Sequence, residues 1–331
     1  MRSTISVSRR SFLALAASAA LALGGCGGKS GEAAPDDGKR KVATVSDGPI
    51  NDGGWNASCY KAMCDAAEKL GWDTAYSENV AQSDWATTFQ NYIDEGYDLL
   101  FIQGEEYKDA VEQVSEENPS AHFALLQGDV ESDGIESLAP DSSQIGQLAG
   151  ALAGLLTKTG SVGFIGGVEL DSTLEKIDAF QGALTKANPD ATATVVYAGS
   201  FTDAAKGKEI ASSMVNQQNV DVLFGDASIV DTGAREALAG MEGRYDIGQP
   251  GDIGAKDSAL IACSVVTDNE TMLEQSMRNV ENGTFGNKTI LGNLENGGVR
   301  VGTFSDTIVD AATQEAYGKI VERIKAGTYL D

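Results

Sequence analysis

From Lys41 onward, hydrophobic positions alternate between short continuous runs and longer stretches in which they recur every three or four residues. The first pattern is typical of a buried strand and the second of an amphipathic helix. Strand-type runs lie at 42–45, 74–76, 99–102 and 123–126, and helix-type stretches at 58–70, 85–95 and 107–117. Because alternating strands and helices build a parallel sheet covered by helices, we expect an α/β domain here.

The series begins again after a helix-type stretch of small residues at 142–157. Strand-type runs follow at 161–165, 194–197, 222–224 and 260–262, with helix-type stretches at 172–187, 204–217 and 231–239. We therefore predict two α/β lobes, formed by 41–140 with about 264–285 and by 141–263 with about 286–331. Open α/β sheets bind ligands beyond the carboxyl ends of their strands, so we expect a site in the cleft between the lobes.

The first 26 residues differ from the rest of the chain. Arg9 and Arg10 precede an apolar run, 12–23, that leads to Gly24-Gly25-Cys26. This run is shorter than the roughly 20 residues that span a bilayer, so we interpret 1–25 as a cleaved signal peptide of twin-arginine type. General export stays an alternative route. Lipid on Cys26 would then anchor the protein at the extracytoplasmic face of the cell membrane, with residues 26–40 as a flexible tether.

Charge and composition exclude several classes of function. The chain has 24 basic and 49 acidic residues, a net charge of −25 that becomes −28 once the three arginines of the signal peptide are removed. Nucleic acid is therefore not expected as a partner. With His122 as the only histidine and no CxxC or GxSxG motif, we expect no metal, no cofactor and no Ser/His/Asp catalysis. The state of Cys59, Cys64 and Cys263 stays open, with free thiols favoured.

The most informative loop follows the first strand and contains two acids, two amides and an indole. These residues are Asp47, Asn51, Asp52, Trp55 and Asn56. A tryptophan among Gly and Asp residues favours a stacking partner, and the polar side chains can bond the edges of a ring ligand. The alternative is that Asp52 or Asn56 caps the next helix while Trp55 packs under the loop.

This loop resembles the basic membrane protein family of substrate-binding lipoproteins, the nucleoside-binding components of ABC importers. In that family the first strand ends in Asp and a glycine-containing turn leads to an Asp-Lys-Ser-Phe-Asn block. Asp47, Asp52, Trp55 and Asn56 occupy the matching positions, with Trp replacing the Phe that stacks on the base. The resemblance extends over about 41–331 through the segments 118–126, 147–151, 164–167, 179–182 and 196–209. It implies a two-lobed type I periplasmic-binding-protein fold, a monomer, a nucleoside-like ligand and an ABC permease as partner.

The departures from the family pattern bear on the ligand. Gln127 stands where the family commonly has an Asp that bonds the base. Of the acids and lysine that grip the ribose, this chain keeps only Asp252 and has Thr267 in place of the lysine. Buried polar groups of this kind discriminate strongly, so their loss points to a nucleobase, a modified nucleoside or another small polar ring.

Further candidates follow other strands. Gln103 and Asp226 would orient the ligand or else cap helices, and Phe180 would oppose Trp55 across the ligand. We expect closure about a hinge near Pro140, Cys263 and Gly286. Two other functions stay open: a sensory binding protein without transport, and an exported nucleoside or glycoside hydrolase that uses Asp47 and Asp52 as paired carboxylates.

Overall fold

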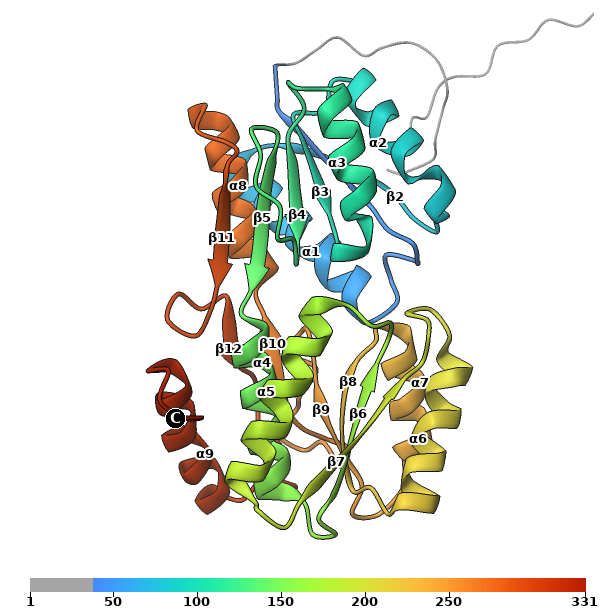
Figure 1. Cartoon of the computed structure of the whole chain (residues 1–331), viewed down its shortest axis with the longest axis vertical. Helices are drawn as coiled ribbons and strands as arrows, with labels where there is room; N and C mark the ends of the chain where they lie inside the picture. Colours follow the sequence, from blue (N-terminus) through green and yellow to red (C-terminus); the bar gives the residue numbers. More distant parts are fainter. Residues whose placement is uncertain (1–37) are drawn as a thin grey trace, which may run out of the picture. The chain divides into compact units, whose positions relative to one another are not determined.

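The computed structural model describes residues 38–331. The predicted signal peptide, Cys26 and nearly all of the tether lie outside the described residues. Within 38–331 the strands form two six-stranded sheets, each covered by helices on both faces (Figure 1). The predicted two-lobed α/β fold is therefore confirmed.

The first sheet has the strand order β11-β5-β4-β3-β1-β2, and all of its pairings are parallel. Its strands are β1 (Lys41–Val45), β2 (Asp73–Ser77), β3 (Leu99–Ile102), β4 (Phe123–Leu126), β5 (Ile135–Pro140) and β11 (Lys288–Gly292). Its helices are α1 (Trp55–Leu70), α2 (Trp85–Asp94), α3 (Lys108–Glu117) and α8 (Asn269–Asn282), with short 3-10 turns η1 (Gln82–Asp84) and η2 (Glu105–Tyr107). Helices α1 and α8 bury one face of the sheet, and α2 and α3 bury the other.

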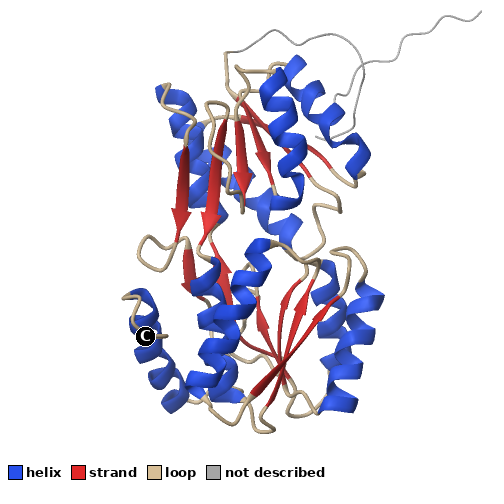
Figure 2. Ribbon diagram, in the orientation of Figure 1, coloured by secondary structure: helices blue, strands red, loops and turns tan. Residues whose placement is uncertain are grey.

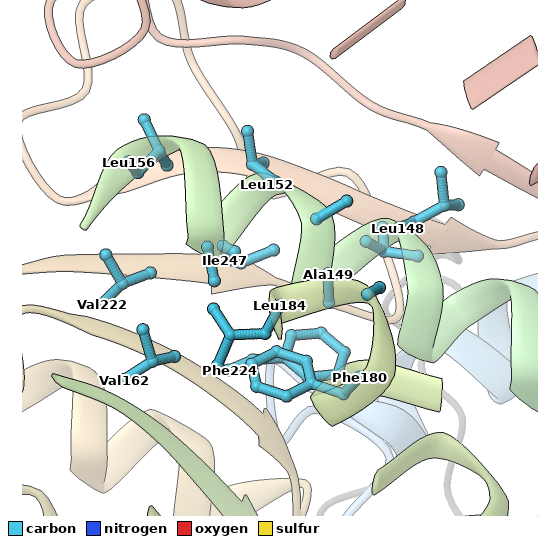
Figure 3. Packing of buried hydrophobic residues seen from close by; sticks show 14 of the residues in the cluster. Leu148, Ala149, Leu152, Leu156, Val162, Phe180, Leu184, Val222, Phe224 and Ile247 are labelled. Atoms are coloured by element: carbon cyan, nitrogen blue, oxygen red, sulfur yellow. The ribbon is translucent and has the colours of Figure 1, made fainter. Parts of the chain in front are cut away.

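The second sheet has the order β12-β10-β9-β8-β6-β7, with only β12 antiparallel to its neighbour. Its strands are β6 (Ser161–Gly166), β7 (Thr192–Tyr197), β8 (Val222–Asp226), β9 (Tyr245–Gly248), β10 (Ile261–Thr267) and β12 (Val299–Val301). Its helices are α4 (Ser142–Leu156), α5 (Asp171–Ala187), α6 (Ala204–Gln218), α7 (Ile229–Leu238) and α9 (Ala311–Lys325). Helices α4, α5 and α9 cover one face around the cluster of Figure 3, and α6 and α7 cover the other.

The chain crosses between the sheets after β5, after β10 and after β11. The second and third crossings, after Thr267 and Gly292, come later than the positions near 263 and 286 that we predicted. The reason is that the strand beginning at Ile261 continues in the second sheet through Thr267, and all of its residues are buried. The first and third crossings are joined, because the Asp141 N–H donates to the Gly292 carbonyl at 2.8 Å.

The cysteines and the histidine have structural positions. Within residues 38–331 the three thiols are free, with Cys59 and Cys263 buried. The His122 ring lies against Phe285, with centroids 4.7 Å apart, and its Nδ1 bonds the Asp98 carbonyl. In the same range, no helix combines the length and apolar content needed to cross a membrane.

Candidate functional site

The carboxyl ends of the two sheets face each other, as the arrowheads in Figure 2 show. Residues beyond these strand ends line a cavity. It encloses about 630 Å³ of empty space, part of which is open to solvent. The first lobe lines it with Asp47, Gly54, Trp55, Asn56, Glu106 and Gln127. The second lobe contributes Leu170, Thr173, Phe201, Asp226, Ala227, Ser228, Asp231, Gln249 and Pro250. The cleft predicted from the strand ends is thus present.

On the first-lobe side, an indole lies beside polar groups. Trp55 is the first residue of α1, not a loop residue as we expected, and its Nε1 donates to the Gln103 carbonyl at 2.6 Å. This bond fixes the ring while part of it stays at the cavity wall. Burial raises the pKa of Asp47, although a hydrogen bond from the Asn56 side chain opposes the rise. Gln127 follows β4 in a left-handed conformation, with φ at 57°.

Asp52 caps α1 and does not line the cavity. Its Oδ1 accepts hydrogen bonds from the Gly54 and Ala57 N–H groups at 2.8 and 2.9 Å. Its Oδ2 accepts from the Ser228 hydroxyl of the second lobe at 2.9 Å. Asp52 therefore caps α1, as the alternative interpretation predicted. It also forms a hydrogen bond between the lobes. Asn51 is exposed and also lies outside the cavity lining.

On the second-lobe side, Asp226 ends β8 and forms an ion pair with Lys176 of α5 at 2.9 Å. The lysine side chain is 2% exposed. The same carboxylate accepts from the Thr173 hydroxyl at 2.9 Å and the Gln249 amide at 3.0 Å. Burial alone would raise the pKa of Asp226, but the ammonium and these hydrogen bonds lower it below its usual value.

Two further carboxyl groups at the cavity have strongly raised pKa values. Burial, with the nearby charge of Asp47, raises the pKa of Glu106 to about 7. Burial raises the pKa of Asp231 to about 8 although Arg235 opposes the rise. Asp231 Oδ2 accepts a hydrogen bond from the Ala227 N–H at 2.9 Å. The buried Oδ1 of Asp231 has no hydrogen-bond partner among residues 38–331. Perturbed acids of this kind are typical of functional sites.

The family model that matches this chain describes ABC transporter substrate-binding proteins of PnrA-like type and covers residues 39–328. The chain belongs to this family. The nucleoside-binding protein BmpA of an ABC transporter of Lactococcus lactis is 29% identical over 94% of this chain and 96% of its own length. A CD4+ T-cell-stimulating antigen of Listeria innocua is 32% identical over 64% of this chain, and the match spans 62% of that protein.

Solved structures of solute-binding proteins share the fold of this family member. One from Conexibacter woesei superposes with a TM-score of 0.68 at 23% identity, covering 87% of this chain and 97% of its own. One from Aeropyrum pernix superposes with a TM-score of 0.73 at 20% identity, covering 87% of this chain and 85% of its own. The two-lobed periplasmic-binding-protein fold and the family resemblance seen in the sequence are both confirmed.

The structure places three other predicted residues of this PnrA-like protein away from the cavity. Phe180 is buried in the core of the second lobe, stacked on Phe224 with centroids 5.9 Å apart (Figure 3). Asp252 is exposed and accepts from the Thr303 N–H and hydroxyl, the latter at 2.8 Å. Gln103 is buried behind Trp55, where its Nε2 donates to the Thr44 hydroxyl at 2.7 Å. It supports the indole and does not line the cavity.

An acid and ammonium pair that we did not predict lies at the second-lobe side of the cavity. Thr267 is buried in β10 and does not line the cavity. Lys176 of α5 and Asp226 of β8 form this pair, and Asp226 lines the cavity. We did not predict Lys176, because a lysine within an amphipathic helix is usually at the surface.

Proposed function

We propose that this chain is the lipid-anchored, extracytoplasmic binding component of an ABC importer. In this proposal the cavity binds a nucleoside, a nucleobase or a related polar ring, and the protein delivers it to a permease. One observation carries the ligand class: Trp55 lies at the cavity wall beside the polar side chains of Asp47, Asn56 and Gln127. The nucleoside ligand named for the Lactococcus lactis relative supports it.

Transport by such a protein requires a closed state that the ligand stabilises. The cavity has side chains from both lobes, so a ligand that contacts both binds the closed arrangement more tightly than an open one. Thr173, Asp226 and Gln249 would meet it from the second lobe. The three crossings between the sheets are the segments about which the lobes would turn.

The occupied oxygens of Asp52 argue against the hydrolase alternative. A glycosidase of the usual kind needs two carboxyl groups free to act on either side of the scissile bond. Both carboxylate oxygens of Asp52 instead hold the start of α1, and one also accepts the Ser228 hydroxyl. The pair of Asp47 and Asp52 is therefore unsuited to this chemistry.

The test is a thermal-unfolding screen of the purified protein against nucleosides, nucleobases, sugars and amino acids. A ligand at 100 times its Kd stabilises the native state by about 2.7 kcal/mol, which raises Tm measurably. We expect stabilisation by nitrogen heterocycles and none by amino acids. Stabilisation by free bases but not by ribosides would show that no ribose grip remains. If no base or nucleoside raises Tm, the proposed ligand class is refuted.

Trp55→Ala should weaken binding of the best ligand from this screen by about 1–3 kcal/mol, because one stacking face is lost. Isothermal titration of both proteins measures the difference. Trp55→Phe is the matched control: it keeps a stacking ring, as the family has at this position, and should retain most of the affinity. Unchanged affinity in Trp55→Ala would show that the indole does not contribute to ligand binding.

A further inference from the structure

Four carboxyl groups line the cavity, and one of them is balanced by a cation. They belong to Asp47, Glu106, Asp226 and Asp231. Asp226 is paired with the buried Lys176 and also accepts two neutral hydrogen bonds. Among residues 38–331, no lysine, arginine or histidine forms an ion pair with the other three. The cavity therefore has an excess of acid over base.

Asp231 is the decisive residue because it is buried and incompletely bonded. It is 6% exposed, and its Oδ1 lacks a hydrogen-bond partner among the described residues although Asp231 lines the cavity. Arg235, one turn further along α7, pairs instead with Asp246 of β9 at 3.4 Å. Oδ1 packs against Gly225 of β8. When Asp231 is ionised, its charge is therefore incompletely compensated within the described residues, and a cation in the cavity would compensate it.

The aromatic side chains of the cavity suit a positively charged ring. Trp55 and Phe201 both line it. The face of an indole attracts cations more strongly than that of any other aromatic side chain, most of all where water is displaced. Because Trp55 Nε1 is already bonded to the Gln103 carbonyl, the ring plane is fixed before a ligand arrives.

We propose that the ligand of this cavity is a cationic nitrogen heterocycle, such as an N-alkylated nucleoside or a pyridinium compound. Its charge would lie between the indole and the carboxyl groups of Glu106 and Asp231. This inference rests on the proposed function, because it takes the cavity as the ligand site. It disfavours phosphorylated ligands, whose charge the excess of acid would repel.

The proposal predicts how affinity depends on pH. Burial raises the pKa of Glu106 to about 7, with Asp47, Glu105 and Asp226 adding to the rise. Burial raises the pKa of Asp231 to about 8, with Asp246 and Asp226 adding to the rise and Arg235 opposing it. Both groups are therefore largely protonated in mildly acidic solution.

A permanent cation binds most tightly once both groups are ionised. Its affinity should therefore rise as the pH increases from about 6 to about 9, whereas that of a neutral ring should not.

The experiment compares two matched pairs of probes by isothermal titration of the purified protein. N1-methylnicotinamide and 1-methyladenosine are the cations, and nicotinamide and adenosine are their neutral parents. Near pH 8 we expect at least one cation to bind about tenfold more tightly than its parent. The permanent charge of N1-methylnicotinamide makes it the probe for the pH series.

Variants separate a charge effect from a change of shape. Asp231→Asn removes the charge but keeps an oxygen that can accept from the Ala227 N–H. It should weaken cation binding about tenfold and reduce the rise of affinity with pH, leaving the part due to Glu106. Glu106→Gln is a second variant in case the first is poorly folded. Asp178→Asn, at an exposed position of α5, makes the same change in net charge and should leave affinity unaltered.

The outcomes distinguish this inference from the proposed function. If each neutral parent binds at least as tightly as its cation, the charge inference is overturned while the nucleoside-like ligand stands. The same holds if neither cation binds and a neutral nucleoside from the thermal screen does. If no heterocycle binds at all, both proposals fail.

Discussion

At the residue scale, the ion pair between Lys176 and Asp226 stabilises the second lobe and also holds Asp226 at the cavity wall. Both groups are removed from most of the surrounding water, with 2% and 15% of their side chains exposed. Desolvating two charges is costly, and the cost is offset only while each has its partner. The hydrogen bonds from Thr173 and Gln249 complete the shell around the carboxylate.

Lys176→Met should therefore lower the free energy of unfolding by about 3–5 kcal/mol, because it leaves Asp226 without its cation. Urea unfolding of both proteins at neutral pH measures this. The pKa of Asp226 is lowered in the folded state, so the ionised carboxylate stabilises the fold at pH values above its usual pKa, and this stabilisation is lost as the pH falls. The difference in unfolding free energy between the two proteins should therefore become smaller in acid. Lys319→Met, which breaks an exposed pair with Glu315, is the control and should change stability by less than about 1 kcal/mol. Equal effects would contradict the argument.

Residues at the carboxyl end of a strand, or within two positions of it, could be placed from the sequence, since such positions meet at the sheet edge. Asp47, Gln127 and Asp226 all line the cavity for this reason. Glu106 and Asp231 were missed because they lie beyond the strand ends, in a 3-10 turn and a helix. A carboxyl in such a segment is normally solvated, and only the packing of both lobes buries it.

At the element scale, α4 and α5 approach closely along the glycines of α4. A methyl group added at Gly150 would lie 2.1 Å from the Phe180 carbonyl oxygen, and one at Gly146 would lie 2.2 Å from that of Lys176. Side chains of these two helices interdigitate in the core shown in Figure 3. The small-residue pattern that the sequence shows at 142–157 is explained by this contact.

Gly150→Ala should destabilise the protein by about 1–3 kcal/mol, because the added methyl forces two backbones apart. Thermal unfolding without ligand measures the effect. Gly318→Ala in α9, where nothing lies within 4 Å of the new methyl, is the control. It should stabilise the protein slightly, since alanine favours the helix. If both substitutions stabilise, close packing is not the reason for the glycine.

Two strands show where the hydrophobic pattern does not predict an element. Strands β5 and β9 were not predicted, because each has a buried acid that interrupts its apolar run. Glu136 of β5 accepts from the Asn279 side chain and the Gly286 N–H. Asp246 of β9 pairs with Arg235. These partners come from distant segments, so the sequence pattern alone does not reveal that the two acids can be buried.

At the scale of the whole folded region, two polar contacts join the lobes beside the cavity. One is the bond from Ser228 to Asp52, and the other runs from the Ser172 hydroxyl at the start of α5 to Glu105 at 3.0 Å. Each bond requires the lobes to be close together. They therefore favour the closed arrangement that a ligand also selects.

Ser172→Ala should weaken ligand binding about two- to tenfold, because it removes one neutral hydrogen bond from the closed state only. Titration with the best ligand from the screen measures this. Ser212→Ala is the control, since that hydroxyl donates to the Lys208 carbonyl within α6 and is indifferent to closure. Unchanged affinity in Ser172→Ala, or an equal loss in both variants, would show that the contact between the lobes does not stabilise the closed state.

A crystal structure of the protein with its best heterocyclic ligand would show whether a ring is held between the lobes. We expect the ring to lie against Trp55, with polar contacts from Asp47 or Asn56 in the first lobe and from Asp226, Asp231 or Gln249 in the second. A ligand bound outside this cavity, or held by one lobe alone, would contradict this expectation.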